Sequence, residues 1–254
     1  MRLVVVTPAY NAARHLRGVV DRLLQASPPD LVRIVLVDDG SRDDTYAVAT
    51  ALAAQRREIA VVRRPDNGGY GAAMKDGLAA ARAAGAEIVA CLHADGQYSP
   101  EALGRLVAEL RGRGLDLLQG SRIAAGTALA GGMPVYKYVA NAVLNVLENA
   151  TLQLHMTDYH SGYLVYGPRT LERIAFRSLS DGFDFDLEVI ASARAAGLAV
   201  GEAPIPTHYG DEISHLQPVT YGLRVLRVLW RYRRGRYDPP RAGPAAAGRP
   251  ARSV

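Results

Sequence analysis

Paired carboxylates at the end of an apolar run are the first residues of this sequence that could do chemistry. Asp38 and Asp39 directly follow the run Ile34–Val37. At such a position a carboxylate can accept hydrogen bonds from the imide of a nucleobase or from a ribose hydroxyl. The alternative is a capping role, because the Asp-Asp-Thr sequence at 43–45 suits a helix start. The two roles are compatible, since Asp38 and Asp39 precede that cap.

A second candidate is the segment 93–97, His-Ala-Asp-Gly-Gln, which follows the run Ile88–Leu92. Alternate residues leave a strand end in one direction, so Asp95 and Gln97 can present oxygen atoms to a hard divalent cation. Mg²⁺ is usually held by one or two protein groups together with a substrate diphosphate, an arrangement that also neutralises a departing nucleotide. His93 is a softer candidate ligand and could instead hydrogen-bond a phosphate. The alternative is that the segment only makes a turn.

Five short apolar runs explain how these side chains are positioned. The runs are Leu3–Val6, Ile34–Val37, Ile59–Val62, Ile88–Leu92 and Leu115–Leu118, with amphipathic stretches between them. Strand-helix alternation of this kind predicts an α/β fold whose mostly parallel sheet is covered by helices on both faces. The polar or glycine-rich segments 7–11, 38–45, 66–71 and 93–100 then lie at the carboxyl edge of the sheet, where ligands bind.

Two common nucleotide-binding motifs are missing from this edge. A dinucleotide site needs a glycine fingerprint directly after the first strand, and a P-loop needs a Walker A sequence. Here the first run is followed by Thr-Pro-Ala-Tyr-Asn at 7–11, and neither pattern occurs in the chain. Nicotinamide and P-loop chemistry are therefore not predicted.

The alternation of short apolar runs with amphipathic stretches changes after Gly120. A helical pattern covers Met133–Leu154, and a polar turn follows at Thr157–Gly162. The segment Asp181–Glu188 is predicted to open another helix, and a strand is predicted near Leu198–Glu202.

Composition places the chain among folded globular proteins. It has 254 residues, of which 49% are hydrophobic and 22% charged. No run approaches the length of a membrane span, and Met1 leads into a strand-like segment rather than a signal peptide. The single cysteine, Cys91, excludes an intramolecular disulfide and favours a reducing compartment. We therefore expect a cytoplasmic protein.

The net charge of +5 is concentrated at one end of the chain, because residues 216–254 hold nine arginines and one acidic residue. The rest of the chain is close to neutral. This distribution favours an anionic surface that is met by one end of the molecule. No motif with nucleic-acid-binding spacing accompanies it, so nucleic-acid binding is not predicted.

Six motifs in order resemble the family 2 glycosyltransferases with the GT-A fold, and within them the dolichyl- or polyprenyl-phosphate sugar synthases. They are Thr7-Pro-Ala-Tyr-Asn11, Val37-Asp-Asp-Gly-Ser-Arg-Asp-Asp-Thr45, Asn67-Gly-Gly-Tyr-Gly71 with Gly77, Ala94-Asp-Gly-Gln97 with Pro100-Glu101, Gly120-Ser-Arg122, and Asp158 with Ser161-Gly162. The resemblance covers roughly residues 3–215. It implies a GT-A glycosyltransferase domain at 1–215, with a nucleotide-sugar-binding half at 1–122 and an acceptor-side half at 123–215.

The resemblance also implies a UDP- or GDP-linked sugar as donor and a Mg²⁺ or Mn²⁺ ion on its diphosphate. The implied donor-binding residues are Pro8, Ala9, Tyr10, Asn11, Asp38, Asp39, Asn67, Gly68, Gly71, Ala94, Asp95 and Arg122. The implied metal ligands are Asp95 and Gln97, with His93 where the family usually has an aspartate. The residues expected on the acceptor side are Ser161, Gly162, Glu188, His208 and His215.

Catalysis is assigned by the resemblance to Asp95, Arg122 and Asp158, with polyprenyl phosphate as the expected acceptor. A phosphate acceptor is already an anion and attacks without a base, whereas a hydroxyl acceptor needs a carboxylate within hydrogen-bond reach. Asp158 is the first candidate for that base, ahead of Asp184 and Asp186. Metal and arginine would stabilise the departing diphosphate. Single displacement predicts inversion at the sugar.

Two alternative functions stay open. One is transfer to a hydroxyl of a small molecule or glycan, because the segment 209–215 lacks the basic residues that the synthases carry nearby. The other is a non-catalytic nucleotide-sugar binder. Two departures from the family pattern favour it: His93 replaces an aspartate, and Ala12 stands where the family often has an acid.

The C-terminal part of the chain is predicted to form an amphipathic basic helix within 216–237, followed by a disordered tail at 238–254. In the helix, leucines and Trp230 lie near one face and arginines near another. Arginine and tryptophan suit a peripheral contact with a membrane, on its inner face. The alternative is a terminal helix packed on the domain.

Overall fold

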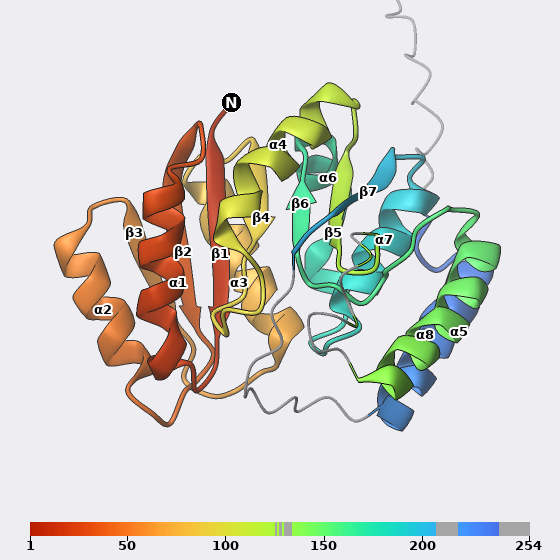
Figure 1. Cartoon of the computed structure of the whole chain (residues 1–254), viewed down its shortest axis with the longest axis horizontal. Coiled ribbons are helices and arrows are strands. Elements are labelled where there is room, and N and C mark those ends of the chain that lie inside the picture. The colour runs from red at the N-terminus through yellow and green to blue at the C-terminus, as the bar shows by residue number, and fades with distance from the viewer. Residues whose placement is uncertain (125, 127–128, 130–133, 207–217, 239–254) are drawn as a thin grey trace, which may run out of the picture.

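The computed structural model describes residues 1–124, 126, 129, 134–206 and 218–238. Within them, helices cover both faces of a seven-stranded sheet (Figure 1). The strands are β1 (Leu3–Ala9), β2 (Leu31–Asp38), β3 (Ile59–Arg63), β4 (Ile88–Cys91), β5 (Leu117–Ser121), β6 (Leu164–Tyr166) and β7 (Val200–Pro204). The helices are α1 (Ala13–Ala26), α2 (Thr45–Gln55), α3 (Tyr70–Ala83), α4 (Leu103–Gly112), α5 (Val135–Leu152), α6 (Pro168–Arg173), α7 (Phe185–Ala195) and α8 (Pro218–Arg233), with 3₁₀ turns at Pro100–Ala102 and Phe176–Ser178.

The strand order is β3-β2-β1-β4-β6-β5-β7, and every neighbouring pair is parallel except the two that involve β6. The predicted mostly parallel sheet is therefore confirmed. The sequence did not predict β6, because three residues are too few to show a strand period. This antiparallel strand lies between β4 and β5, so the fifth apolar run does not pair with the fourth.

Alternation along each strand divides the core between the two faces of the sheet. Val4 and Val6 pack on one face with α3, α7 and α8, whereas Leu3 and Val5 pack on the other with α1, α2 and α4. All four side chains are fully buried. Burial on both faces is the reason that these strands are continuous apolar runs in the sequence.

Helices α5 and α8 lie side by side at one end of the molecule (Figure 1). In α8, Val225, Val228 and Leu229 are buried in the core, which supports the packed terminal helix. Leu223, Leu226 and Trp230 are exposed. No helix in the described ranges has both the length and the apolarity to cross a bilayer. The tail predicted to be disordered lies outside the described residues, apart from Asp238.

Candidate active site

Hydrogen bonds between backbone amides and side-chain oxygens join the segment after β1 to the segment after β2. The amide of Asn11 donates to Ser41 Oγ at 3.0 Å, and Asn11 Oδ1 accepts from the amide of Arg42 at 2.9 Å. Asn11 has a φ of 49°, in the left-handed region that asparagine tolerates better than most residues. Ala9 is buried, Pro8 is partly buried, and Tyr10 is exposed at 40% on the rim. The first two predicted segments therefore form one surface.

Asp38 and Asp39 lie at the end of β2, and their carboxylates have different partners. Asp38 Oδ1 accepts from the amide of Ser41 at 3.1 Å, and its Oδ2 lies 3.6 Å from Arg63 Nε. Asp39 accepts from the amides of Gly68 and Gly69 at 3.0 and 2.9 Å. It also pairs with Arg64 at 2.8 Å. Neither residue caps α2, whose N-cap is Asp44. Asp39 instead holds the segment 67–71, here called the glycine loop, through the amides of Gly68 and Gly69. The sequence did not indicate this role.

Replacing Asp39 by alanine should loosen the glycine loop and weaken the nucleotide-sugar binding that the sequence predicts here, because two backbone amides and Arg64 lose their acceptor. Hydrogen bonds to a charged group contribute about 1.5–3 kcal/mol each, so we expect at least tenfold weaker binding of a nucleotide sugar. Isothermal titration calorimetry measures this. Asp66→Ala, which removes an exposed carboxylate from the same segment, is the control and should bind normally. Normal affinity in the Asp39 variant would contradict the role.

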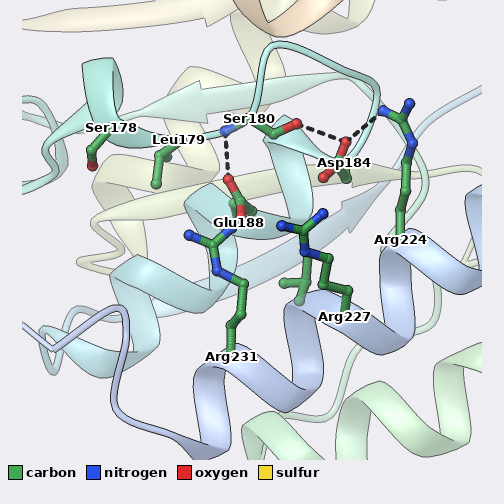
Figure 2. Close-up of a pocket in the computed structure, with 9 residues that line it drawn as sticks. Ser178, Leu179, Ser180, Asp184, Glu188, Arg224, Arg227 and Arg231 are labelled. Carbon is green, nitrogen blue, oxygen red and sulfur yellow. Dashed lines mark hydrogen bonds and ion pairs between the residues drawn. The ribbon is translucent and has the colours of Figure 1, made fainter.

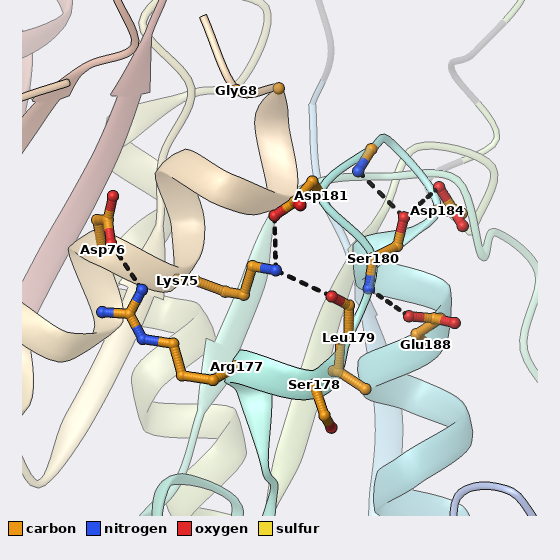
Figure 3. A network of polar contacts seen from close by, with 12 residues as sticks. Gly68, Lys75, Asp76, Arg177, Ser178, Leu179, Ser180, Asp181, Asp184 and Glu188 are labelled. Carbon is orange, nitrogen blue, oxygen red and sulfur yellow. Dashed lines mark hydrogen bonds and ion pairs between the residues drawn. The ribbon is translucent and has the colours of Figure 1, made fainter. Parts of the chain in front are cut away.

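The glycine loop leads into α3, which is held against the segment 178–184. The amide of Gly71 donates to the carbonyl of Asp181 at 2.8 Å. A Cβ on Gly71 would lie 2.3 Å from the carbonyl oxygen of Ser180, so only glycine fits this contact. Lys75 Nζ pairs with Asp181 at 2.6 Å and donates to the carbonyl of Leu179 at 2.9 Å (Figure 3). Asn67 and Gly68 are exposed on the rim.

The predicted metal-binding segment begins directly after β4. Asp95 is partly exposed, and its Oδ1 accepts from the amide of Gln97 at 3.0 Å, while Ala94 is buried. His93 packs between Tyr70 and Tyr98, each 5.1 Å away between ring centroids. Its Nε2 is buried and has no hydrogen-bond partner within the described part of the chain. Burial lowers the pKa of His93, against the opposing charge of Asp95. A neutral imidazole with an unpartnered nitrogen suits a ligand or an acceptor.

These donors fit a divalent cation that also binds a substrate. In the described ranges, no group of three or more His, Cys, Asp or Glu side chains could hold a metal ion. Asp95 and Gln97 supply hard oxygen atoms, and the remaining ligands would have to come from a diphosphate and water.

Tyr70 and Asp186 lie near His93, and the sequence did not predict either of them as a binding residue. Tyr70 Oη donates to Asp186 Oδ2 at 2.8 Å, and burial raises the pKa of Asp186 to about 7. A Cβ on Gly162 would lie 2.3 Å from His93 Nε2 and 3.4 Å from Asp186 Oδ2. The turn at 161–162 therefore closes directly over this cluster. Asp186 was predicted only as a less favoured base, since no spacing links it to residue 93.

Arg122 and Asp158 form a buried ion pair. Arg122 Nε and Nη2 donate to the two carboxylate oxygens of Asp158 at 2.7 and 3.0 Å, and the Arg122 amide lies 3.3 Å from Oδ2. Asp158 is fully buried, which opposes its ionisation, but the charge and hydrogen bonds of Arg122 outweigh burial and lower its pKa. A carboxylate held in this way is a weak base. The buried Ser161 follows in the same turn.

The other residues that were predicted on the acceptor side are not described in contact with Arg122 or Asp158. Glu188 lies between α7 and α8, where it accepts from the amide of Ser180 at 2.5 Å, Arg231 at 2.7 Å and Tyr237 Oη at 2.6 Å. These partners give Glu188 a structural role in joining the two helices. His208 and His215 lie outside the described residues.

Comparison with known proteins matches residues 4–174 to the model described as glycosyl transferase family 2. A polyprenol monophosphomannose synthase of Mycolicibacterium smegmatis is 32% identical over 80% of this chain and 76% of its own length. An undecaprenyl-phosphate mannosyltransferase of Micrococcus luteus is 29% identical over 81% and 83%.

Solved structures show the same fold. Glucosyl-3-phosphoglycerate synthase from Mycobacterium tuberculosis, in complex with UDP, superposes with a TM-score of 0.69 over 91% of this chain and 79% of that one, at 20% identity. Structures of the same synthase have been determined with Mn²⁺ and with Mg²⁺.

Proposed function

Because this chain belongs to glycosyl transferase family 2, we propose that it moves a sugar from a UDP- or GDP-linked donor to a polyprenyl phosphate. The observation that carries the acceptor class is the buried ion pair of Asp158 with Arg122. The first candidate base is thereby held as a weak base, and an ionised phosphate needs none. The two relatives supply independent support, since one is named for polyprenol monophosphomannose and the other for undecaprenyl phosphate.

On the donor side, Pro8, Tyr10 and Asp38 would contact the nucleoside, and Asp39 would position the glycine loop beside it. Asp95 and Gln97 would hold Mg²⁺ or Mn²⁺, with His93 as a third candidate ligand. The cation would neutralise charge on the diphosphate of the donor. Its use is further supported by the Mn²⁺ and Mg²⁺ complexes of the solved synthase.

The reaction would be a single displacement. An oxygen atom of the acceptor phosphate attacks the anomeric carbon while the bond from that carbon to the diphosphate oxygen breaks. A nucleoside diphosphate leaves, no proton has to be removed from the attacking atom, and the configuration at the sugar inverts. Arg122 would present positive charge to the leaving diphosphate, and Asp158 would fix its orientation.

Transfer assays with the purified chain test this proposal. UDP- and GDP-sugars are offered in turn with a short polyprenyl phosphate, with and without Mn²⁺, and the lipid product is separated and identified. We expect a sugar phosphate diester of the polyprenol in the presence of metal. Transfer only to hydroxyl acceptors would overturn the acceptor class, and donor binding without any turnover would favour the non-catalytic binder.

Asp186 favours transfer to a hydroxyl as the second candidate function. Its pKa of about 7 lies near the value that suits a general base, and it lies beside His93 and Gly162. The variant Asp186→Asn separates the two functions, because transfer to a hydroxyl should fall by at least a hundredfold and transfer to a phosphate should not.

A membrane contact would bring the chain to a lipid acceptor, and α5 and α8 supply the surface. Val135, Tyr136, Val139, Val143, Val146 and Leu147 are exposed on α5, beside Leu223, Leu226 and Trp230 on α8. The inner face of the membrane is the proposed side. Leu229 is buried rather than available to lipid, which corrects the expectation that all leucines of this helix share one face.

Replacing Leu226 and Trp230 together by asparagine should weaken sedimentation with anionic liposomes about tenfold or more, because each exposed side chain loses apolar area that the interface would bury. Val32→Asn, a replacement of an exposed apolar residue on β2, is the control. Equal sedimentation of both proteins would contradict the contact. Deletion of residues 219–254 is unsuitable here, since it removes Val225, Val228 and Leu229 from the core.

A further inference from the structure

A pocket of about 370 Å³ lies between α8 and the segment that leads into α7 (Figure 2). From α8, Arg224, Arg227 and Arg231 point toward this segment, as Figure 2 shows. Their spacing of three and four residues places them on one side of the helix. Ser180 and Leu179 line the opposite wall.

The pocket has more positive than negative groups. Asp184 pairs with Arg224 at 3.1 Å and accepts from Ser180 Oγ at 2.9 Å. Glu188 pairs with Arg231 at 2.7 Å. Arg227 forms no ion pair with any carboxylate that the structure describes. Its guanidinium therefore remains available beside two neutralised pairs.

A second space of about 420 Å³ adjoins the first and shares Ser178, Leu179, Arg227 and Arg231 with it. It adds Arg236, Trp230 and Tyr237. Arg236 is likewise without an ion pair to the described carboxylates. Among the described lining residues of both spaces, four guanidiniums face two carboxylates, so the positive charges of Arg227 and Arg236 are not balanced by a described carboxylate.

The pocket and the contact between Asp186 and Tyr70 lie on different faces of α7. Asp184 and Glu188 are one helical turn apart and share a face of α7, whereas Asp186 lies on the other side of that turn and contacts Tyr70. The arginine pocket thus lies on a different side of α7 from the contact between Asp186 and Tyr70.

We propose that this pocket is a second ligand site that binds a phosphate group. Planar guanidiniums bind phosphate oxygens through paired N–H donors, and Arg227 and Arg236 have no carboxylate partner among the residues that the structure describes, so their donors can bind an anion. The phosphate is carried either by a lipid headgroup, since Trp230, one of the exposed apolar residues of α8, lines the adjoining space, or by a soluble phosphate compound.

Trp230 makes the test local, because it is the single tryptophan of the chain and lines the second space. Inorganic phosphate is titrated into the full chain at constant ionic strength, with chloride as the comparison anion, and tryptophan fluorescence is followed. We expect a saturable change with phosphate only. Arg227→Gln should weaken phosphate binding about tenfold, and Arg236→Gln should weaken it in the same direction.

Arg233→Gln is the matched control, because it removes the same charge from the same helix at a position that lines neither space. Equal weakening in Arg227→Gln and Arg233→Gln, or no saturable change in the unaltered chain, would overturn the proposal. Arg227 and Arg233 are both exposed, and circular dichroism checks that each variant is folded.

Vesicles of phosphatidylcholine with and without phosphatidic acid distinguish the two sources of phosphate. If Arg227→Gln loses binding to phosphatidic acid vesicles while Arg233→Gln keeps it, the phosphate belongs to a lipid headgroup. If the two variants bind these vesicles alike while Arg227→Gln still weakens inorganic phosphate, the phosphate is soluble. Because these assays measure binding without a sugar donor, they succeed or fail separately from sugar transfer.

Discussion

Replacing Asp95 by alanine should lower kcat/KM for sugar transfer roughly a hundredfold or more and remove the effect of Mn²⁺ on donor binding. Asp95 is the carboxylate of the segment after β4, and the described residues around it offer too few ligands for a cage built from protein alone. Loss of one hard ligand therefore weakens binding of the cation. The bound cation would contribute several kcal/mol to stabilising the leaving diphosphate. Steady-state assays across a Mn²⁺ titration measure the effect.

Asp21→Ala provides the control for loss of a carboxylate, since Asp21 is exposed on α1. Gln97→Ala should give a smaller effect than Asp95→Ala, because a neutral amide binds the cation less strongly than a carboxylate. Unchanged turnover and donor affinity in the Asp95 variant, with a normal thermal transition, would refute the metal assignment.

Replacing Asp158 by alanine should destabilise the fold by about 3–5 kcal/mol, because it leaves Arg122 buried without its partner. Asp158 is 0% exposed and accepts from Arg122 through both oxygens. Urea unfolding followed by circular dichroism measures the change. The comparison pair is Arg105 and Glu109 on α4, whose side chains are 45% and 30% exposed, and Glu109→Ala should cost less than about 1 kcal/mol. Similar losses for the two variants would contradict the weight given to burial.

The same carboxylate predicts how stability depends on pH. The pKa of Asp158 is lowered in the folded chain, so folding stabilises the ionised form of this carboxylate relative to its protonated form. Its contribution is present above the unfolded pKa, about 4, and is lost as the pH falls through the folded value. The unaltered chain should lose stability in acid more steeply than Asp158→Asn. Parallel curves would contradict the linkage.

Several features of this protein could be predicted from residue types and spacing. The continuous apolar runs predicted β1 to β4 and a mostly parallel sheet, since both faces of such strands must be buried. The polar segments after them predicted a rim where residues distant in sequence meet. Parallel strands place their carboxyl ends together, which is why Asn11 could be expected beside Ser41.

Other features depended on the tertiary structure. The position of β6 between β4 and β5 follows from the antiparallel pairing of a three-residue strand, which leaves no pattern in the sequence. The side of α8 that is buried could not be read from its alternating leucines and arginines, because packing against α7 and α5 decides which face is covered. Leu229 is buried for this reason, although Leu226 is exposed.

The sequence by itself determined which chemical groups reach the rim, and the tertiary structure decided what each of them contacts there. Asp39 and Asp158 are carboxylates at predicted positions, yet one fixes the glycine loop and the other forms a buried pair with Arg122. Asp186 lies near His93 because α7 packs against α3, which carries Tyr70. A carboxylate's pKa and reactivity depend on burial and on partners within a few ångströms. Those partners come from segments far away in the chain, so spacing along the sequence does not contain them.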